Sequence, residues 1–333
     1  KDQNKEFNKK ELKKSKKIKY TNSPHDLSNS NIFIIAVPTP INKNKTPDLS
    51  HLKSACELVG KYLKKGSTII FESTVYPGCT EDYCNPILER VSSLKMNKDF
   101  FLGYSPERIN FGDKKNTLSS IKKIIGASNK NTLTKISQLY KSIIKAGIYK
   151  CESIKIAEAA KIIENSQRDI NIAFINEINQ IFDKMNIDTY KVLDAAKTKW
   201  NFLNFEPGLV GGHCIGVDPY YLTFKAKQIG FKTKVILSGR EINDKMGAYI
   251  ANRFINKFKK NKNQKKKILI MGLSFKENIP DIRNSKVFDI INVLKKKNYK
   301  IDVFDPVVNY DEIKKYKINC KILSEIIGLC QKV

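Results

Sequence analysis

The residue best suited to covalent chemistry is Cys214, which lies in the loop GGHCIGVDP at residues 211 to 219. Glycines permit positive φ angles and a close backbone approach, which a loop wrapped around a ligand requires. Structural cysteines occur more often in periodic apolar runs, but the context alone leaves a nucleophile, a redox thiol and a structural cysteine open. A metal site is disfavoured, because His213 and Cys214 have no second pair of ligands in the chain.

Length and composition exclude several classes of protein. The 333 residues exceed what one hydrophobic core organises, so two or three domains are expected. Seven scattered cysteines without a CxxC pair disfavour a disulfide framework, and we expect no bound metal. The net charge of +28 comes mostly from dispersed lysines, so the runs at 9–20 and 259–267 are interpreted as solvated surface and no nucleic-acid partner is expected. No apolar run approaches the about 20 residues of a membrane span and no secretory pattern is found, so we expect a cytoplasmic protein without a membrane partner.

Apolar runs in the first 150 residues predict a parallel α/β sheet, because predicted strands alternate with helices. Strands are predicted at 30–40, 66–78, 100–109 and 122–128, and helices at 48–65 and 131–145. The first of these helices is expected to be capped by Asp48 or Ser50. Active residues of such sheets gather beyond the carboxyl ends of the strands, which here are Pro38 to Pro40, Ser73 to Pro77 and Ser105 to Arg108.

The middle of the chain predicts an all-α region. Residues 154–185 read as one long helix with more than one apolar stripe, which suits a central spine or a dimer contact. Lys161 and Asn165 lie one turn apart on this helix and share a face. Shorter helices are predicted near 189–197, 220–229 and 242–258.

A second α/β unit follows, with strands at 265–276 and 299–306 on either side of a helix at 287–298. Asp305 stands where a ribose-binding carboxylate would lie, but the unit lacks GxGxxG, so the dinucleotide signal is weak. The predicted fold class is therefore α/β, with two Rossmann-like parallel-sheet domains joined by a central all-α domain that contains the long spine helix. The domains are placed at 1–150, 151–262 and 263–333.

Seven motifs occur in the order typical of one known family. They are VPTP (37–40), ESTVYPGCTE (72–81), YSPERI (104–109), AKIIENSQRDINIAFINE (160–177), GGHCIGVDPYYL (211–222), GREIND (239–244) and GLSFKENIPDIRNS (272–285). They cover nearly the whole chain and resemble the UDP-glucose/GDP-mannose dehydrogenase family, and EPGLVGGHCIGVDPYYL (206–222) is similar to its UDP-N-acetylhexosamine branch. Members of this family oxidise C6 of a nucleotide sugar twice with NAD, which gives a uronic acid. The resemblance therefore implies an NAD-dependent enzyme with a UDP-sugar substrate.

The resemblance assigns the central chemistry to four residues. A thiolate at Cys214 would hold the aldehyde as a thiohemiacetal, which is oxidised to a thioester and then hydrolysed. Lys161 would lower the pKa of that thiol and, with Asn165, stabilise negative charge on the substrate oxygen, although alone it could be a solvated helix lysine. Asp218 would assist proton transfer or orient a water, although alone it could cap the helix that begins near residue 220.

The resemblance also assigns residues to the cofactor, the water and the sugar nucleotide. Glu107 and Thr74 match family positions that handle the water of hydrolysis, although Glu107 alone would pass as a surface turn residue. Thr39 and Thr74 match contacts to NAD, and Arg283 matches an arginine that approaches the cofactor. The implied substrate-binding set, which changes the interpretation of the C-terminal unit to a UDP-sugar site, is Lys161, Asn165, Gly211, Gly212 and Lys276.

The chain departs from the family pattern at both ends. The family's first strand and GxGxxG turn, which seats the pyrophosphate on a helix N-terminus, would precede residue 1, and no glycine occurs before Gly60. The last sheet is cut short after Cys330. We therefore expect a fragment in which both sheets are incomplete and the NAD cradle is weakened. At 109–113, where some UDP-glucose enzymes carry a second acid, this chain reads INFGD, so that role is not transferred.

The resulting prediction is a UDP-N-acetylhexosamine 6-dehydrogenase that supplies a uronic acid for surface polysaccharide and dimerises through residues 154–185. UDP-N-acetylglucosamine is the expected substrate, because His213 precedes the cysteine and Val217 precedes Asp218, where glucose-type members carry other residues. UDP-N-acetylmannosamine and UDP-glucose are the alternative substrates. The alternative classes are a non-catalytic fragment that retains UDP-sugar binding or dimerisation, and a basic nucleic-acid binder.

Overall fold

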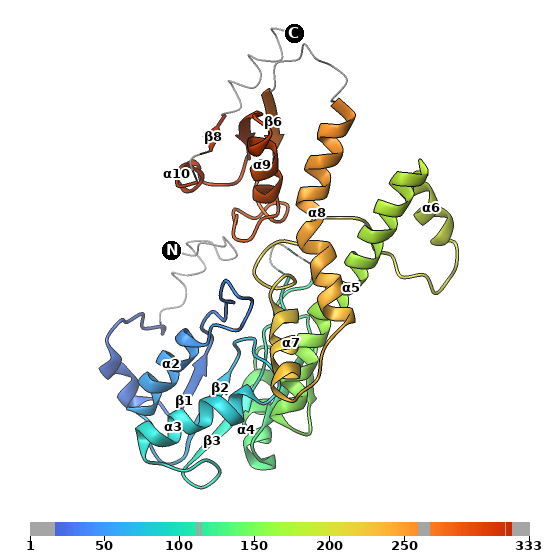
Figure 1. The fold of residues 1–333 in the computed structure, drawn as a ribbon. Helices are drawn as coiled ribbons and strands as arrows, with labels where there is room; N and C mark the ends of the chain where they lie inside the picture. The colour runs from blue at the N-terminus through green and yellow to red at the C-terminus, as the bar shows by residue number, and fades with distance from the viewer. Residues whose placement is uncertain (1–16, 111–112, 114, 259–266, 317, 322–333) are drawn as a thin grey trace. The chain divides into compact units, whose positions relative to one another are not determined.

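The computed structural model describes residues 17–110, 113, 115–258, 267–316 and 318–321. The chain divides into two units: the first comprises Lys1–Asn165 and Val217–Thr233, and the second comprises Ser166–Gly216 and Lys234–Val333. Helix α5, Ile154–Met185, contributes residues to both units (Figure 1). Most of the lysine-rich runs at 9–20 and 259–267 lies outside the described residues, as does Cys330.

The first unit is built on a sheet with the strand order β1-β2-β3-β4-β5. The strands are β1 Ile32–Ile35, β2 Ser67–Phe71, β3 Phe100–Tyr104, β4 Lys123–Ala127 and β5 Ile148–Lys150. As predicted, β1, β2 and β3 are parallel, whereas β4 runs antiparallel to β3. Parallel neighbours need a crossover connection, usually a helix. The described residues between β3 and β4 form no helix, so the chain returns in the opposite direction.

Helices cover both faces of this sheet, which explains why every residue of β2 is buried. They are η1 Pro24–Asn29, α2 Ser50–Gly60, the π-helical turn η2 Cys79–Cys84, α3 Asn85–Ser92, α4 Lys130–Lys141 and α7 Asp218–Gln228. Ile69 and Phe71 of β2 pack in a core with α2 and α3, while Ile70 packs in a separate core with α4. Alternate strand residues therefore point to opposite, equally covered faces.

The second unit combines helices with a three-stranded parallel sheet in the order β6-β7-β8. Its elements are the C-terminal part of α5, α6 Thr189–Ala196, α8 Val235–Phe258, β6 Lys267–Met271, α9 Val287–Lys296, β7 Lys300–Phe304, α10 Tyr310–Lys314 and β8 Asn319–Cys320. Its core joins Ile255 of α8, Ile291 of α9 and Val303 of β7. The predicted α/β class with a helical middle region is confirmed. Among the described helices, none is both long and apolar enough to cross a bilayer.

Two helix starts differ from the sequence prediction. Leu49 is the N-cap of α2, and the Asp48 carboxylate instead accepts a hydrogen bond from the Ser50 backbone N–H at 3.0 Å. Helix α8 begins at Val235 rather than at 242. Gly239 inside its first turns is unfavourable by propensity, but it faces α5 at van der Waals distance, so close helix packing offsets that cost.

Helix α5 has an inverted pattern of burial. A row of polar side chains is buried, namely Glu158, Lys161, Asn165, Asp169 and Asn176. A row of large apolar side chains is exposed, namely Ile156, Ile163, Phe174, Ile181 and Met185. At 3.6 residues per turn, each row falls on one face of the helix, and the two faces are about 180° apart. The buried face of α5 therefore carries chemistry-bearing groups, and its exposed face carries the apolar surface.

Candidate active site

Thr39 and Thr74 follow neighbouring parallel strands of the first unit. Strands β1 and β2 end at the same edge of the sheet, where Ser73 Oγ donates a hydrogen bond to the Val37 carbonyl at 2.7 Å. Both threonines are half-buried beyond this edge. The predicted gathering of these strand ends is confirmed, while contact of the two hydroxyls with NAD stays a prediction.

Glu107, which follows β3, belongs to a cluster of charges rather than to a plain surface turn. Its Oε1 accepts hydrogen bonds from the backbone N–H groups of Arg108 at 2.6 Å and Ile109 at 2.7 Å. Its Oε2 lies 3.2 Å from Nζ of Lys123, which is 4% exposed and lies equally close to Glu72 Oε1. Lys123 thus orients the Glu107 carboxylate. The sequence analysis missed this lysine, because it stands at the start of an apolar strand without a motif.

Lys161 and Asn165 of α5 meet Asp218, the first residue of α7. Asn165 Nδ2 donates to Asp218 Oδ2 at 2.5 Å, and the three side chains are 8%, 7% and 4% exposed in chain order. Burial raises the pKa of Asp218 to about 6, although the charge of Lys161 and the hydrogen bond from Asn165 act in the opposite direction. The alternative of a solvated Lys161 is therefore wrong. The capping alternative for Asp218 is also wrong, because Val217 is the N-cap and no side-chain cap bond forms.

This trio has the properties of a proton-transfer and oxyanion-binding site. A lysine and an amide N–H₂ are donors for a substrate oxygen that gains negative charge. A carboxyl group with a pKa near 6 is largely ionised at neutral pH and remains basic enough to accept a proton. Because the three side chains are buried, the low local dielectric strengthens each of these interactions.

In the second unit, the Cys214 loop is anchored through its glycines while the Cys214 side chain is exposed. A Cβ atom on Gly212, whose φ is +81°, would lie 2.7 Å from the Phe275 ring, and one on Gly211 would lie 2.9 Å from the Asn284 carbonyl oxygen. Asn284 Nδ2 also donates to the Gly212 carbonyl at 3.1 Å. The interpretation of Cys214 as a buried structural cysteine is therefore wrong. The glycines allow close packing against residues 275 and 284, and their contact with a substrate stays a prediction.

His213 faces protein groups rather than a metal partner. Its Nδ1 lies 3.7 Å from Asp281 Oδ2, and its ring meets the Phe275 ring edge-on at 5.9 Å. Burial lowers the pKa of His213, and the charge of Arg283 lowers it further while Asp281 raises it. Burial and the charge of Arg283 therefore both favour the neutral imidazole of His213. Arg283 is hydrogen-bonded to Asp281, with its Nε at 3.0 Å from both carboxylate oxygens. The contact of Arg283 with the cofactor stays a prediction.

Lys276 lies half-buried in the segment that follows β6, and Ser274 Oγ donates to its carbonyl at 3.0 Å. Asp305 holds the same segment, because its Oδ2 accepts from the N–H groups of Leu273 at 2.7 Å and Ser274 at 3.0 Å. Its Oδ1 accepts two further backbone N–H groups beyond β7. Asp305 is 1% exposed, so it is a structural carboxylate rather than a ribose ligand. This supports the changed interpretation of the C-terminal unit.

A buried polar chain supports the start of the Cys214 loop. The side chain of Asn176 brackets Gly208, donating to its carbonyl and accepting from its N–H, both at 2.9 Å. Asn243 of α8 accepts from Asn176 at 2.8 Å and donates to Asp169 Oδ1 at 2.7 Å. Arg240 donates to the same oxygen at 2.5 Å. Sequence reasoning missed these groups, although their helical spacing with Lys161 and Asn165 is a signal that could have identified the residues on α5.

The predicted site residues therefore fall into two sets. The first unit brings together Lys161, Asn165 and Asp218, and it carries Thr39, Thr74 and Glu107 at its strand ends. The second unit carries Gly211, Gly212, Cys214, Lys276 and Arg283. Each set is internally ordered by hydrogen bonds from buried side chains.

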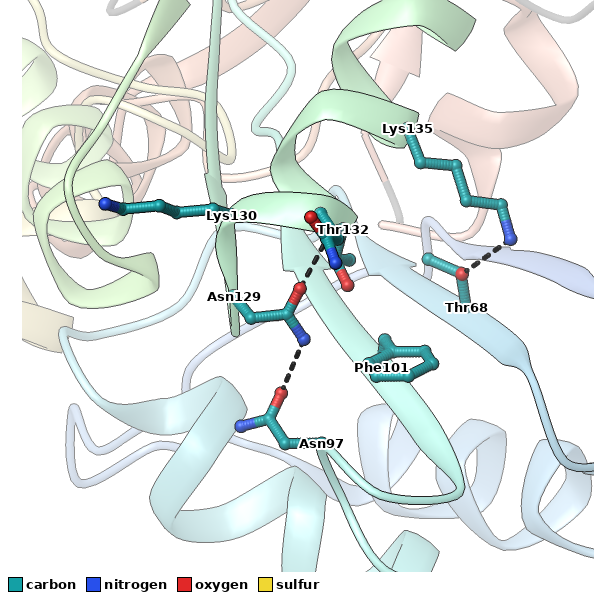
Figure 2. Close-up of a pocket in the computed structure, with 8 residues that line it drawn as sticks. Thr68, Asn97, Phe101, Asn129, Lys130, Thr132 and Lys135 are labelled. Carbon is teal, nitrogen blue, oxygen red and sulfur yellow. Dashed lines mark hydrogen bonds between the residues drawn. The ribbon is translucent and has the colours of Figure 1, made fainter.

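A cavity of about 490 Å³ opens at the opposite edge of the first sheet (Figure 2). Thr68 and Phe101, near the amino ends of β2 and β3, line it together with the first turns of α4. Figure 2 shows its polar groups bonded to one another, because Asn129 joins Asn97 to the first turn of α4 and Lys135 donates to Thr68. None of the predicted site residues lines this cavity.

The raised pKa of Asp218 predicts a pH-dependent effect of the substitution Asp218→Asn. The folded state holds a proton on Asp218 up to pH about 6, whereas the unfolded state releases it near 3.8, so wild-type stability falls as pH rises between these values. Relative to wild type, the free energy of unfolding of the variant should therefore rise by up to ~3 kcal/mol between pH 4 and pH 7. Any effect of the substitution that is the same at both pH values cancels in this comparison. Urea unfolding at both pH values measures this change. A difference that does not vary with pH would show that folding does not raise the pKa of Asp218.

The sequence is similar to known proteins along almost its whole length. Three models of the UDP-glucose/GDP-mannose dehydrogenase family match: the NAD binding domain at residues 4–144, the central domain at 155–245 and the UDP binding domain at 269–333. The chain is 54% identical to the UDP-N-acetyl-D-glucosamine 6-dehydrogenase of Pseudomonas aeruginosa, over 91% of this chain and 72% of that protein. It is 52% identical to the enzyme of the same name from Salmonella typhi, over 94% and 74%.

The solved structures agree with these relatives. The UDP-D-ManNAc dehydrogenase of Pyrococcus horikoshii superposes with a TM-score of 0.83 at 32% identity, over 90% of this chain and 71% of that chain. The expected NAD cofactor, oxidoreductase class and UDP-binding domain are thereby confirmed. With matches in three consecutive domains and relatives above half identity, the chain belongs to the UDP-glucose/GDP-mannose dehydrogenase family.

Proposed function

We propose that the protein oxidises C6 of UDP-N-acetylglucosamine in two NAD-dependent steps and releases the uronic acid, for use in surface polysaccharide. The observation that carries this proposal is the identity of 54% and 52% to two relatives named for that sugar nucleotide. The solved relative named for the mannosamine epimer is only 32% identical. The functional segments are proposed at 1–150 for the cofactor, 151–262 for catalysis and dimerisation, and 263–333 for the UDP-sugar.

The residues at the carboxyl edge of the first sheet fit the cofactor. Thr39 and Thr74 place half-exposed hydroxyls beyond adjacent parallel strands, which is where open α/β sheets bind nucleotides. We also assign Arg283 to the cofactor, because its guanidinium is exposed and positively charged. The chemistry supplied by NAD, when bound, is acceptance of a hydride from C6 in each oxidation.

Cys214 supplies the covalent step. After the first oxidation gives an aldehyde, Sγ forms a bond to C6 while the carbonyl π bond breaks and its oxygen takes up the thiol proton. Loss of a hydride to a second NAD and of the hydroxyl proton would then convert this thiohemiacetal to a thioester. Attack by water then breaks the C–S bond, which releases the carboxylate and restores the thiol. An exposed thiol in a loop with a fixed backbone suits this role, because the nucleophile must reach a diffusing substrate.

Lys161, Asn165 and Asp218 handle the charge and protons at C6. The lysine and the amide donate to the substrate oxygen as it gains negative charge, and the carboxylate receives the hydroxyl proton or orients the water. Glu107, oriented by Lys123, and Thr74 position the water that cleaves the thioester. The residues assigned to binding of the sugar nucleotide are Lys276, Gly211 and Gly212, in addition to Lys161 and Asn165.

We place this reaction in the cytoplasm, because a catalytic thiol must remain reduced. No disulfide joins the cysteines among the described residues, as is usual for proteins of a reducing compartment.

We further propose a homodimer formed through α5. Its exposed apolar side chains Ile156, Ile163, Phe174, Ile181 and Met185 lie on one face of the helix, which a second copy of the same helix would cover. Two copies related by a two-fold axis can bury the same face against itself.

Assay of the full-length protein with a panel of UDP-sugars tests the reaction. UDP-N-acetylglucosamine should yield two NADH per sugar, with slower turnover of the mannosamine epimer and of UDP-glucose. Cys214→Ser should reduce uronic acid formation by at least about a thousandfold, because the covalent intermediate is lost. Absorbance at 340 nm and chromatography of the product measure both outcomes.

Cys320→Ser is the matched control, because Cys320 lies half-buried in β8, away from the loop. It should keep wild-type turnover. Undiminished oxidation by Cys214→Ser would remove that thiol from the reaction. Tight UDP-sugar binding by a wild-type protein that makes no NADH would instead support a non-catalytic binder.

Phe174→Glu should convert the dimer to a monomer, because it places a charge in the centre of the apolar row. Arg168→Glu, an exposed change off that row, should leave the dimer intact. Light scattering after size-exclusion chromatography measures the mass. An unchanged mass for Phe174→Glu would place the contact elsewhere.

A further inference from the structure

Glu158 is a buried carboxylate of α5 to which no role has been assigned above. It is 0% exposed, yet both its oxygens are used. Its Oε2 accepts the Gly78 backbone N–H at 2.5 Å, and its Oε1 accepts the Thr80 backbone N–H at 2.9 Å. The side chain therefore fastens the segment that leaves β2 to the spine helix, at two points.

The arrangement requires a carboxylate rather than a neutral group of the same shape. Two N–H donors point at one side chain, and a glutamine would offer one oxygen and turn its own N–H₂ toward the other donor. The donors belong to a turn in which Gly78 has a φ of +93° and the Cys79 N–H donates to the Tyr76 carbonyl at 3.0 Å. The partner of Glu158 is thus main chain that the turn holds by a hydrogen bond of its own.

The clamp joins residues that the proposed reaction uses. Thr74 lies four positions before Gly78 in the clamped segment, which is proposed to contact NAD and water. Lys161 and Asn165 lie about one and two turns beyond Glu158 on the same face of α5. A shift of the segment would therefore move Thr74 relative to the donors that hold the substrate oxygen.

We propose that Glu158, in its ionised form, is a positioning residue for the oxidation, holding the segment from Thr74 to Thr80 against the helix that carries Lys161 and Asn165. This inference rests on the proposed function. Misplacement by about 1 Å of groups far from the reacting atoms can lower rates a hundredfold. Loss of the Glu158 contacts would therefore lower the turnover rate.

The charges around Glu158 make the clamp sensitive to pH. Burial raises the pKa of Glu158 to about 7, the hydrogen bonds from Thr80 and Gly78 lower it, and the charge of Glu81 raises it. Tyr104 of β3 also faces this carboxylate, and burial followed by the charge of Glu158 raises the pKa of its hydroxyl. At the outer side of Gly78, Asp82 pairs with Lys155 at 3.5 Å.

Two substitutions separate charge from reach in the full-length enzyme. Glu158→Gln keeps the length and loses the charge, while Glu158→Asp keeps the charge and shortens the reach. Each should lower kcat tenfold or more with KM for UDP-N-acetylglucosamine within about twofold. In wild type, kcat should fall as pH drops through about 7, because a protonated Glu158 cannot accept both N–H groups. The fall of kcat near pH 7 should be absent from Glu158→Gln. The kcat of this variant should fall only near pH 6, where Asp218 takes up a proton.

Hydrogen exchange of the peptide spanning 74–84 reports the clamp without activity. At pH 8 it should be at least tenfold faster in Glu158→Gln than in wild type. Glu57→Gln is the matched control, because Glu57 is half-buried on α2 and its ion-pair partners, Lys53 and Arg90, are exposed side chains. It should match wild type in exchange and in kcat.

The outcomes separate this inference from the proposed function. Unchanged exchange in both variants would show that no clamp exists. Faster exchange with wild-type kcat would show that the clamp is structural only, and would overturn the positioning role. A wild-type protein that oxidises none of the UDP-sugars would overturn the proposed function, and the reaction role of Glu158 with it, even if the exchange data revealed the clamp.

Discussion

The buried polar row of α5 is the constraint on which both sets of site residues depend. Unsatisfied polar groups in a protein interior cost several kcal/mol each, so every member of the row needs a partner. Glu158 is matched by the chain after β2, Asn165 by α7, and Asp169 and Asn176 by α8 and the loop before Cys214. The helix thus dictates which loops must approach it. The site residues are therefore ordered by the same contacts that spare the buried polar row the free-energy cost of unsatisfied hydrogen bonds.

A recurring device is the use of a side chain to hold a backbone. Asn176 brackets both main-chain groups of Gly208, and Asp305 collects four N–H groups from two loops. Loops in general must satisfy their main-chain polar groups with something other than a helix or sheet ladder. Here Asn176 belongs to α5 and Asp305 directly follows β7, so the loops are tied to the regular elements of the fold. The exposed thiol at Cys214 is consequently carried on a fixed main chain.

The sequence predicted what depends on local pattern. The bounds of α5 follow from its periodicity, and the apolar runs located β1 and β2, although both strands end several residues before the prolines at which the predicted strands stop. Features set by distant partners were not predictable. Lys123 reads as the first residue of a strand, and nothing local indicates two carboxylates around it. The reversal of β4 follows a connection whose described residues form no helix, and the early start of α8 depends on close packing around a glycine.

The packing of the two glycines before His213 limits how this chain can drift in evolution. Its composition is strongly biased toward lysine, with a net charge of +28. Solvated positions accept such a bias at little cost, since surface substitutions rarely change stability by more than about 0.5 kcal/mol. At residues 211 and 212, however, even one added carbon would meet the Asn284 carbonyl or the Phe275 ring at under 3 Å. Packing alone therefore selects against replacement of these two glycines, independently of any selection on the thiol of Cys214.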